Sequence, residues 1–278
     1  MIHKSSCLLI YLFSVLIACG QNHHVKNIEH FNHTRAYELA KAVQQGNKKK
    51  VERLVKSDSS LLNVINPSTG ANVLVLAIDE EQYEVFKLLL ELGADPNFIN
   101  PYSKHSALMM SIRPFGNDRE WRKEYRYAEL LLKYQANPNY IIEKEFTNEK
   151  GISIKVSSAL LKASGLDLFL VKLLIEYGAD CKKKLGKNQI TPFGEALEAS
   201  KFDIINYYID TLKINVHEPL YIRTTDSLFI QDFVVNNKTL AKLKNDSFDI
   251  GEYNRDRWLL IKKLESMGVD FKNYTYKR

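Results

Sequence analysis

One short pattern is written three times along this chain, and it restricts the fold more than any other feature. The stretch LLLELGADPNFIN covers residues 88–100, LLLKYQANPNYII covers 130–142, and KLLIEYGADCKKK covers 172–184. Each copy has the pattern of an amphipathic helix end, followed by a position suited to a left-handed backbone and then by a turn. A unit of this size cannot bury its own apolar face, so we expect neighbouring units to stack and form the core.

A second motif marks where each unit begins. Residues 191–193 (TPF) and 158–160 (SAL) have the pattern of a helix N-cap and first turn, and 106–108 (SAL) fits less fully. Together the motifs resemble the ankyrin repeat, with its TPLH-type helix start, its second helix ending in LL-x-x-GAD, and its outward β-hairpin. The resemblance covers residues 36–215, with a weaker return at 258–273. It implies an all-α solenoid of stacked helix-turn-helix units with outward hairpin loops, with about five or six repeats, some degenerate.

The spacing of the units departs from the ankyrin period of about 33 residues. The cap positions Gly93 and Gln135 lie further apart than that period, and so do Gln135 and the next cap. We therefore predict one insertion at 113–125, between the two helices of a unit, and another at 140–156, in the following hairpin. The pattern is lost again at 224–253, where we expect a degenerate unit that contains an inserted helix.

The N-terminal segment differs in character from the repeats. The residues MIHKSS precede an apolar run from Cys7 to Cys19, which is too short to span a bilayer and has the length of a signal-peptide core. The run ends in LIAC at 16–19, which resembles the lipobox of bacterial lipoproteins. The resemblance implies cleavage after residue 18 and a lipid on Cys19. An ordinary secretory signal with a chance cysteine is the alternative.

The lipobox interpretation sets the expected organisation of the chain. Residues 1–18 would be a lipoprotein signal peptide, 19–34 a lipidated flexible tether, and 35–278 the ankyrin-repeat domain. Acyl chains contribute roughly 0.8 kcal/mol per buried CH₂, so two or three of them anchor a protein firmly to a membrane. We expect the protein in the bacterial envelope, facing the periplasm, and Gly20 after the cysteine favours the outer membrane over the inner.

No catalytic motif stands out in the sequence. Residues 151–153 (GIS) lack the second glycine of a nucleophile elbow, and there is no Walker loop, paired CxxC or HExxH. His30 and His33 are spaced like metal ligands on a helix, but no supporting ligand shell is evident, so a solvated tether is the favoured interpretation. Cys181 stands where the other copies have proline, which favours a turn position over a nucleophile. We therefore expect a protein that is not an enzyme and that needs no cofactor or metal.

The charge of the chain is modest, with a formal net charge of +6. Basic runs occur at 48–50 and at 182–184, but acidic residues interleave with them. Dedicated nucleic-acid binders usually carry one continuous basic face, so we expect no nucleic-acid partner. The lysine runs fit solvated turns, and a weak attraction to an anionic membrane or to an acidic partner is the alternative.

What remains is a surface for recognition. In the ankyrin family the hairpin tips and first helices line a binding face, so the resemblance implies a protein partner and a chain that is monomeric when unbound. Trp, Tyr and Arg dominate interface energetics, although these aromatics could instead pack the insertions onto the stack. The predicted partner-binding residues are Tyr102, Lys104 and His105 on one hairpin, Tyr140, Ile142 and Glu143 on the next, Lys183 and Lys184 on the third, and Trp121, Arg122 and Tyr125 on the insertion between helices.

Lipid-anchored ankyrin proteins of this plan resemble immunity proteins, which neutralise toxins delivered into the periplasm. The resemblance implies that the concave face and the long hairpin loops cover a toxin, such as a type VI secretion phospholipase, and that the lipid anchor determines where this happens. A scaffold or chaperone for a resident envelope protein is the first alternative. An enzyme that uses the N-terminal histidines or Cys181 is the second.

Overall fold

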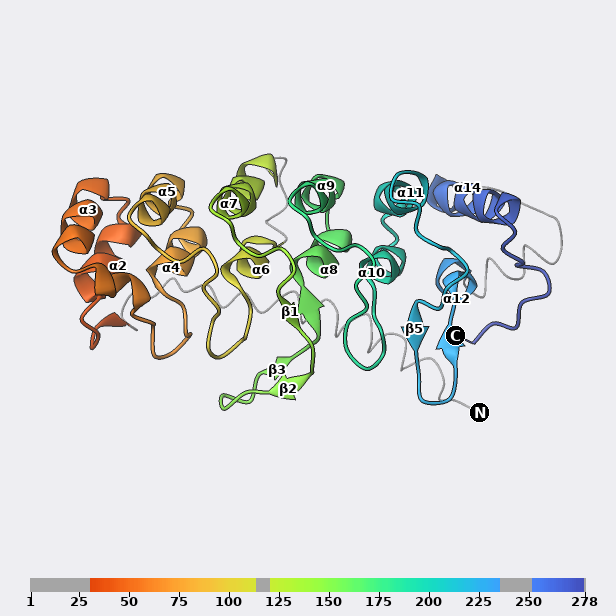
Figure 1. Cartoon of the computed structure of the whole chain (residues 1–278), viewed down its shortest axis with the longest axis horizontal. Helices are drawn as coiled ribbons and strands as arrows, with labels where there is room; N and C mark the ends of the chain where they lie inside the picture. The colour runs from red at the N-terminus through yellow and green to blue at the C-terminus, as the bar shows by residue number, and fades with distance from the viewer. Residues whose placement is uncertain (1–30, 114–120, 236–251, 278) are drawn as a thin grey trace. The chain divides into compact units, whose positions relative to one another are not determined.

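The computed structural model describes residues 31–113, 121–235 and 252–277. The chain, drawn in Figure 1, divides into two compact units, whose described residues are 31–95 with 121 in the first and 96–113, 122–235 and 252–277 in the second. The segment that contains the predicted signal peptide and Cys19 lies outside the described residues.

The first unit is built from two helix pairs. Helices α2 and α4 pack together in one layer and α3 and α5 in the other, so each pair stacks on the next. Helix α4 is buried from Val73 to Ile78, and Asn72 caps it by accepting a hydrogen bond from the Val75 N–H. Phe31, which lies in the segment expected to be a tether, has no exposed surface. The elements are α2 (Tyr37–Gln44), α3 (Lys48–Ser57), the 3₁₀ helix η2 (Ser59–Asn63), α4 (Val73–Asp79) and α5 (Tyr83–Glu91).

The second unit continues the same plan with four more helix pairs. The first helices of the pairs, α6, α8, α10 and α12, pack against one another in sequence order, and α9, α11 and α14 follow along the other layer. The core is therefore made between successive pairs. The helices are α6 (Ala107–Ser111), α7 (Trp121–Lys133), α8 (Ala159–Ser164), α9 (Leu168–Glu176), α10 (Pro192–Glu198), α11 (Phe202–Asp210), α12 (Ile230–Val234) and α14 (Glu252–Ser266).

The predicted helix starts are confirmed. Ser106, Ser158 and Thr191 each accept a hydrogen bond from the backbone N–H three residues further on, with donor–acceptor distances of 3.2, 3.0 and 3.0 Å. Each cap satisfies one of the N–H groups that a helix leaves without an intrahelical partner. The weaker match at Ser106 therefore belongs to the same capping pattern as the two stronger ones.

Most second helices are followed by a left-handed residue, as the repeated GAD pattern predicts, whereas α3 ends in the extended Asp58 at φ −152°. Gly178 and Gly268 have φ values of +86° and +87°. Gln135 occupies the equivalent position after α7 with φ of +66°, and Lys213, one residue further from the end of α11, has φ of +53°, although both carry a Cβ atom that this conformation disfavours. The left-handed backbone after the helix is thus retained at positions where another residue replaces glycine.

Antiparallel hairpins, here called fingers, project from the second unit. The first finger is residues 98–106, closed by a bridge between Ile99 and Ser106, and the third is residues 180–191, closed by a bridge between Leu185 and Ile190. The second finger (140–158) contains β1 (Ile141–Ile142) paired with β4 (Ser157–Ser158), and β2 (Phe146–Thr147) paired with β3 (Ser153–Ile154). The fourth finger (220–228) contains β5 (Tyr221–Ile222) paired with β6 (Ser227–Leu228).

The three predicted insertions, at 113–125, 140–156 and 224–253, agree with the structure to different degrees. The segment 140–156 forms most of the long second finger. Helix α7 already begins at Trp121, so Tyr125 lies within a repeat helix and not on an insertion; residues 114–120 lie outside the described residues. Within 224–253, where a degenerate unit with a helix is expected, the structure has α12 as the first helix of a repeat, and residues 236–251 lie outside the described part. The described residues contain six helix pairs, in agreement with the expected all-α ankyrin architecture.

Candidate partner-binding surface

The second finger is fastened to the first. The Tyr140 hydroxyl donates to the Lys104 carbonyl at 2.9 Å, and the Asn148 side-chain amide donates to the Tyr102 carbonyl at 3.2 Å. The Lys150 ammonium stands 3.9 Å above the centre of the Tyr102 ring, within cation–π range. The β2–β3 end of the second finger accordingly bends toward the first finger (Figure 1).

The third finger packs closely on the second. Leu185 anchors it with 1% of its surface exposed. At the next position, Gly186 has φ of +65°, and a Cβ atom placed there would lie 2.8 Å from Val156 Cγ2 and 3.4 Å from the Glu143 carbonyl oxygen. Carbon atoms pack at about 3.5–4.0 Å, so a side chain at this position would force the two fingers apart.

The third and fourth fingers exchange two hydrogen bonds. The Asn188 side-chain amide donates to the Ile222 carbonyl at 2.7 Å, and the Ile222 N–H donates to the Asn188 carbonyl at 2.8 Å. The four fingers of the second unit are therefore joined from each one to the next. A surface joined in this way loses less conformational freedom on binding than four independent loops would.

Asparagines at the base of the fingers link successive repeats, a feature that the sequence reasoning missed. The Asn97 amide donates to the Gln135 carbonyl and accepts from the Asn137 N–H. Asn139 repeats both bonds one unit later, with the Gly178 carbonyl and the Asp180 N–H, each at 2.8 Å. The available signal was the asparagine that two of the three copies share directly after proline.

The predicted residues of the first finger have different environments. Tyr102 is half-buried beneath Lys150, and Lys104 is exposed with a left-handed φ of +57°. His105 is half-buried; its desolvation, and then the charge of Lys162, lower the pKa of its imidazole to about 4. The His105 ring is therefore neutral at physiological pH and offers a partner no charge.

The predicted residues of the second finger also differ in how far they are exposed. Glu143 is exposed, whereas Ile142 retains 5% exposure and packs beneath the finger. Tyr140 is half-buried, and burial raises the pKa of its hydroxyl above the usual range. Of these three, Glu143 offers a partner the most accessible side chain.

Tyr125 lies apart from the fingers, in the layer formed by the second helices. It is 6% exposed and stacks on Phe169 of α9, with ring centroids 5.6 Å apart. Burial, and then the Asp167 carboxylate, raise the pKa of the Tyr125 hydroxyl. The residue therefore packs α7 on α9 and leaves almost no surface for a partner. Trp121 and Arg122 are the first residues of α7, and their side chains lie outside the described part of the structure.

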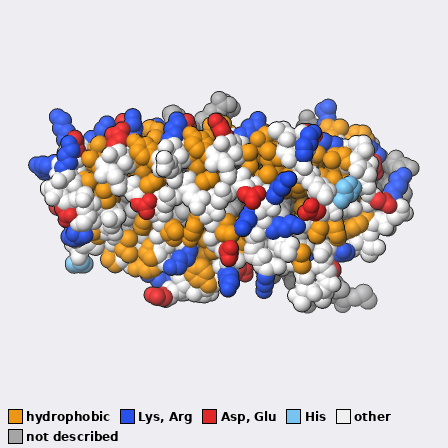
Figure 2. All heavy atoms as spheres, viewed as in Figure 1, with side chains coloured by type: hydrophobic (Ala, Val, Ile, Leu, Met, Phe, Trp, Pro, Cys, Tyr) orange, Lys and Arg blue, Asp and Glu red, His pale blue; other side chains and the backbone are white. Residues whose placement is uncertain are grey.

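Lysines dominate the tip of the third finger. Lys183 and Lys184 are both exposed, so both side chains are accessible to a partner. The Lys184 ammonium lies 3.2 Å from a carboxylate oxygen of Glu218. Basic and acidic side chains are otherwise mixed over the face of the molecule that Figure 2 shows.

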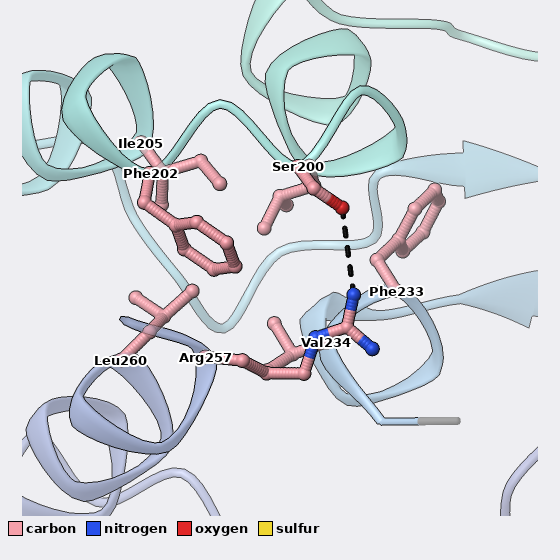
Figure 3. Close-up of a pocket in the computed structure, with 8 residues that line it drawn as sticks. Ser200, Phe202, Ile205, Phe233, Val234, Arg257 and Leu260 are labelled. Atoms are coloured by element: carbon pink, nitrogen blue, oxygen red, sulfur yellow. Dashed lines mark hydrogen bonds between the residues drawn. The ribbon is translucent and has the colours of Figure 1, made fainter. Parts of the chain in front are cut away.

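A small cavity lies between α10, α11, α12 and α14 (Figure 3). It offers about 10 Å³ to a water-sized molecule, roughly the minimum that one water needs. The Arg257 guanidinium donates to the Ser200 hydroxyl at 3.5 Å across it, beside Phe202, Phe233 and Leu260. The cavity is too small for a substrate or cofactor.

Other predicted features concern chemistry. Cys181 is half-buried, and burial, followed by the neighbouring Asp180, raises the pKa of its thiol, which lowers its nucleophilicity at neutral pH. Across 31–113, 121–235 and 252–277, no group of three histidine, cysteine or acidic residues is placed to hold a metal ion. Within the same ranges, no helix has the length and apolar character needed to cross a membrane.

The C-terminal tail closes the last repeat around a buried carboxylate that the sequence did not single out. Asp232 is 2% exposed and accepts from the Phe229 N–H at 3.0 Å. It also accepts from the Tyr274 hydroxyl at 2.6 Å and from the Lys277 N–H at 2.8 Å. The Lys277 ammonium reaches the Ser227 carbonyl at 2.8 Å. The tail is thus bound to both α12 and the fourth finger.

Comparison with known families agrees with this architecture. A family model described as ankyrin repeats (3 copies) matches residues 8–100, which include α2 to α5 and begin within the predicted signal peptide. Comparison with curated proteins finds no match. Beyond residue 100, the helix pairs, caps and fingers repeat the same plan. Ankyrin repeats generally bind protein partners and are typically not enzymes, and the chain is an all-α ankyrin-repeat solenoid.

Proposed function

We propose that the joined fingers of the second unit cover a protein partner in the bacterial envelope, and that this partner is a toxin which the chain neutralises. The observation that carries the proposal is the series of contacts from each finger to the next: hydrogen bonds such as Tyr140 to Lys104 and Asn188 to Ile222, and close packing at Gly186. Such a surface is already ordered before binding, so more of the contact energy appears as affinity.

Occlusion is the mechanism that fits the second finger. This finger is the longest of the four, and Ile152 near its tip is 42% exposed. An exposed apolar side chain on a projecting loop suits insertion into the mouth of an active site. The entrance of a lipase is apolar, which makes a type VI secretion phospholipase the first toxin to test.

The lipid anchor would set where the encounter takes place. The sequence LIAC at 16–19 supports lipidation of Cys19, and we propose that the anchor holds the fingers on the periplasmic side of the outer membrane. Replacement of Cys19 by serine is expected to release the protein into the soluble periplasmic fraction while leaving its affinity for the partner in solution unchanged. Retention of the serine variant on membranes would refute the anchor.

The test of the function is affinity capture from the envelope of the native organism, with residues 20–278 as bait and mass spectrometry as readout. Capture of a hydrolase whose activity falls on binding supports immunity. Ile152→Asp is expected to weaken that capture, whereas Leu259→Asp, which changes another exposed apolar side chain on α14, serves as the control. Capture of a resident envelope protein with unchanged or raised activity would replace immunity with a scaffold or chaperone role.

A further inference from the structure

Positive charge is concentrated on one finger of the second unit. Between Asp180 and Thr191 the chain carries four lysines against one aspartate. The second finger carries equal numbers of acidic and basic residues, as does the fourth, and the first carries Lys104 alone. The lysines of the third finger are Lys182, Lys183, Lys184 and Lys187, and all four are exposed.

Only one of these four ammonium groups is neutralised by a described neighbour. Lys184 is paired with Glu218, but no carboxylate of the described residues lies within 4.0 Å of the other three. Like charges this close repel one another, and the free energy of that repulsion is relieved when anionic groups bind. The lysine cluster, defined as Lys182, Lys183 and Lys187, therefore favours an anionic ligand.

The backbone beneath the lysine cluster is fixed on both sides. Gly186 lies against Val156 of the second finger, and Asn188 exchanges hydrogen bonds with Ile222 of the fourth. Leu185 is buried between them. The finger cannot spread to separate its charges, so the cluster is held ready at a single fingertip.

We propose that the protein partner presents an acidic patch to the lysine cluster. This inference deepens the proposed function, because it assumes that the joined fingers bind a protein. A protein partner fits better than an anionic lipid surface because exposed Glu143 and Glu145 stand on the adjacent finger. The backbone carbonyl oxygen of Glu143 lies 3.4 Å from the Cβ position of Gly186, so the backbones that carry these acidic and basic residues lie side by side. A uniformly anionic bilayer would repel Glu143 and Glu145 while attracting Lys144 between them, whereas a protein can match both signs.

The probe is a fluorescent oligoglutamate peptide, titrated with residues 20–278 at low and at physiological ionic strength and followed by anisotropy. The variant changes Lys182, Lys183 and Lys187 to glutamate, and a second variant changes them to glutamine. The matched control changes Lys49, Lys56 and Lys172 to glutamate, so that the same net charge is altered on exposed positions of α3 and α9.

The expected result is binding by the unaltered protein and by the control, weakened about tenfold or more in the glutamate variant and less in the glutamine variant. Binding should fall as salt screens the charges. No peptide binding, or equal loss in variant and control, overturns the proposal. So does binding to phosphatidylglycerol vesicles that depends on the lysine cluster more strongly than peptide binding does, because the ligand would then be a lipid surface.

The proposal and the proposed function can fail separately. If envelope capture yields no partner while peptide binding depends on the lysine cluster, the acidic preference stands and the envelope function falls. If a toxin is captured and inhibited equally by the unaltered protein and the glutamate variant, the function stands and the acidic patch is refuted.

Discussion

The close contact between the second and third fingers is best tested at Gly186. Replacement by alanine has two separate effects. The left-handed backbone at φ +65° costs about 1 kcal/mol for a residue with a Cβ atom. The added methyl group would also lie 2.8 Å from Val156 Cγ2, and overpacking of this kind costs about 1–3 kcal/mol. Gly186→Ala is therefore expected to destabilise the protein by about 2–4 kcal/mol.

Gly151 supplies the matched control. It has a similar φ of +74°, but a Cβ atom there would meet nothing within 4 Å. Gly151→Ala should therefore cost only the backbone term, about 1 kcal/mol. Urea unfolding of residues 20–278, followed by circular dichroism, gives both values. Adding Val156→Ala to Gly186→Ala should recover part of the loss, because it removes the methyl groups that clash.

Equal destabilisation by Gly186→Ala and Gly151→Ala would refute the packing of the two fingers. The backbone conformation would then account for the whole effect, and the second and third fingers would be independent of each other. A double variant no more stable than Gly186→Ala alone would point the same way, because double-variant cycles detect direct contact.

Three further predictions follow from single residues. Gln135→Gly should raise the free energy of unfolding by up to about 1 kcal/mol, because Gln135 holds φ of +66°; an unchanged urea midpoint would contradict the strain. The pKa of His105 is lowered to about 4, so between about pH 6.5 and 4 the unfolded chain takes up a proton that the folded chain does not. The free energy of unfolding should therefore decrease as the pH is lowered from about 6.5 to about 4. His105→Gln should make this decrease smaller, measured as the difference in urea midpoint between the two pH values. Tyr274→Phe should lower the free energy of unfolding by about 1.5–3 kcal/mol, because it removes a hydrogen bond to the buried Asp232 carboxylate. The measurement is the rate of proteolysis of the C-terminal tail, which should rise. Tyr276→Phe loses only a hydrogen bond to a backbone carbonyl and should have a smaller effect.

The architecture was predictable because its signals are local. Helix periodicity, the caps at Ser158 and Thr191, and the left-handed turn at Gly178 each depend on a few adjacent residues. The plan also survived the loss of one signal, since Gln135 takes the backbone conformation that glycine holds elsewhere. Such patterns repeat from unit to unit, so three clear copies were sufficient to define the fold.

The candidate surface was predictable only in part, because an aromatic or apolar residue near a hairpin has the same sequence signature whether it faces a partner or the core. Tyr125 and Ile142 were expected at the interface and are buried, whereas Lys183 is exposed. The contact between Asn148 and Tyr102 joins residues 46 positions apart and depends on how the second finger bends. No local pattern encodes that bend.

The buried Asp232 has a consequence for how this array can grow. Repeat proteins lengthen by duplication, and a new unit needs an open end on which to stack. At this end, Tyr274 and the backbone of Lys277 already occupy the carboxylate of the final first helix. A unit inserted between α12 and residue 274 would separate Asp232 from these donors, while one placed ahead of α12 would leave the bonds intact. α12 and residues 274–277 are therefore expected to be inherited together, with gains and losses of repeats ahead of them.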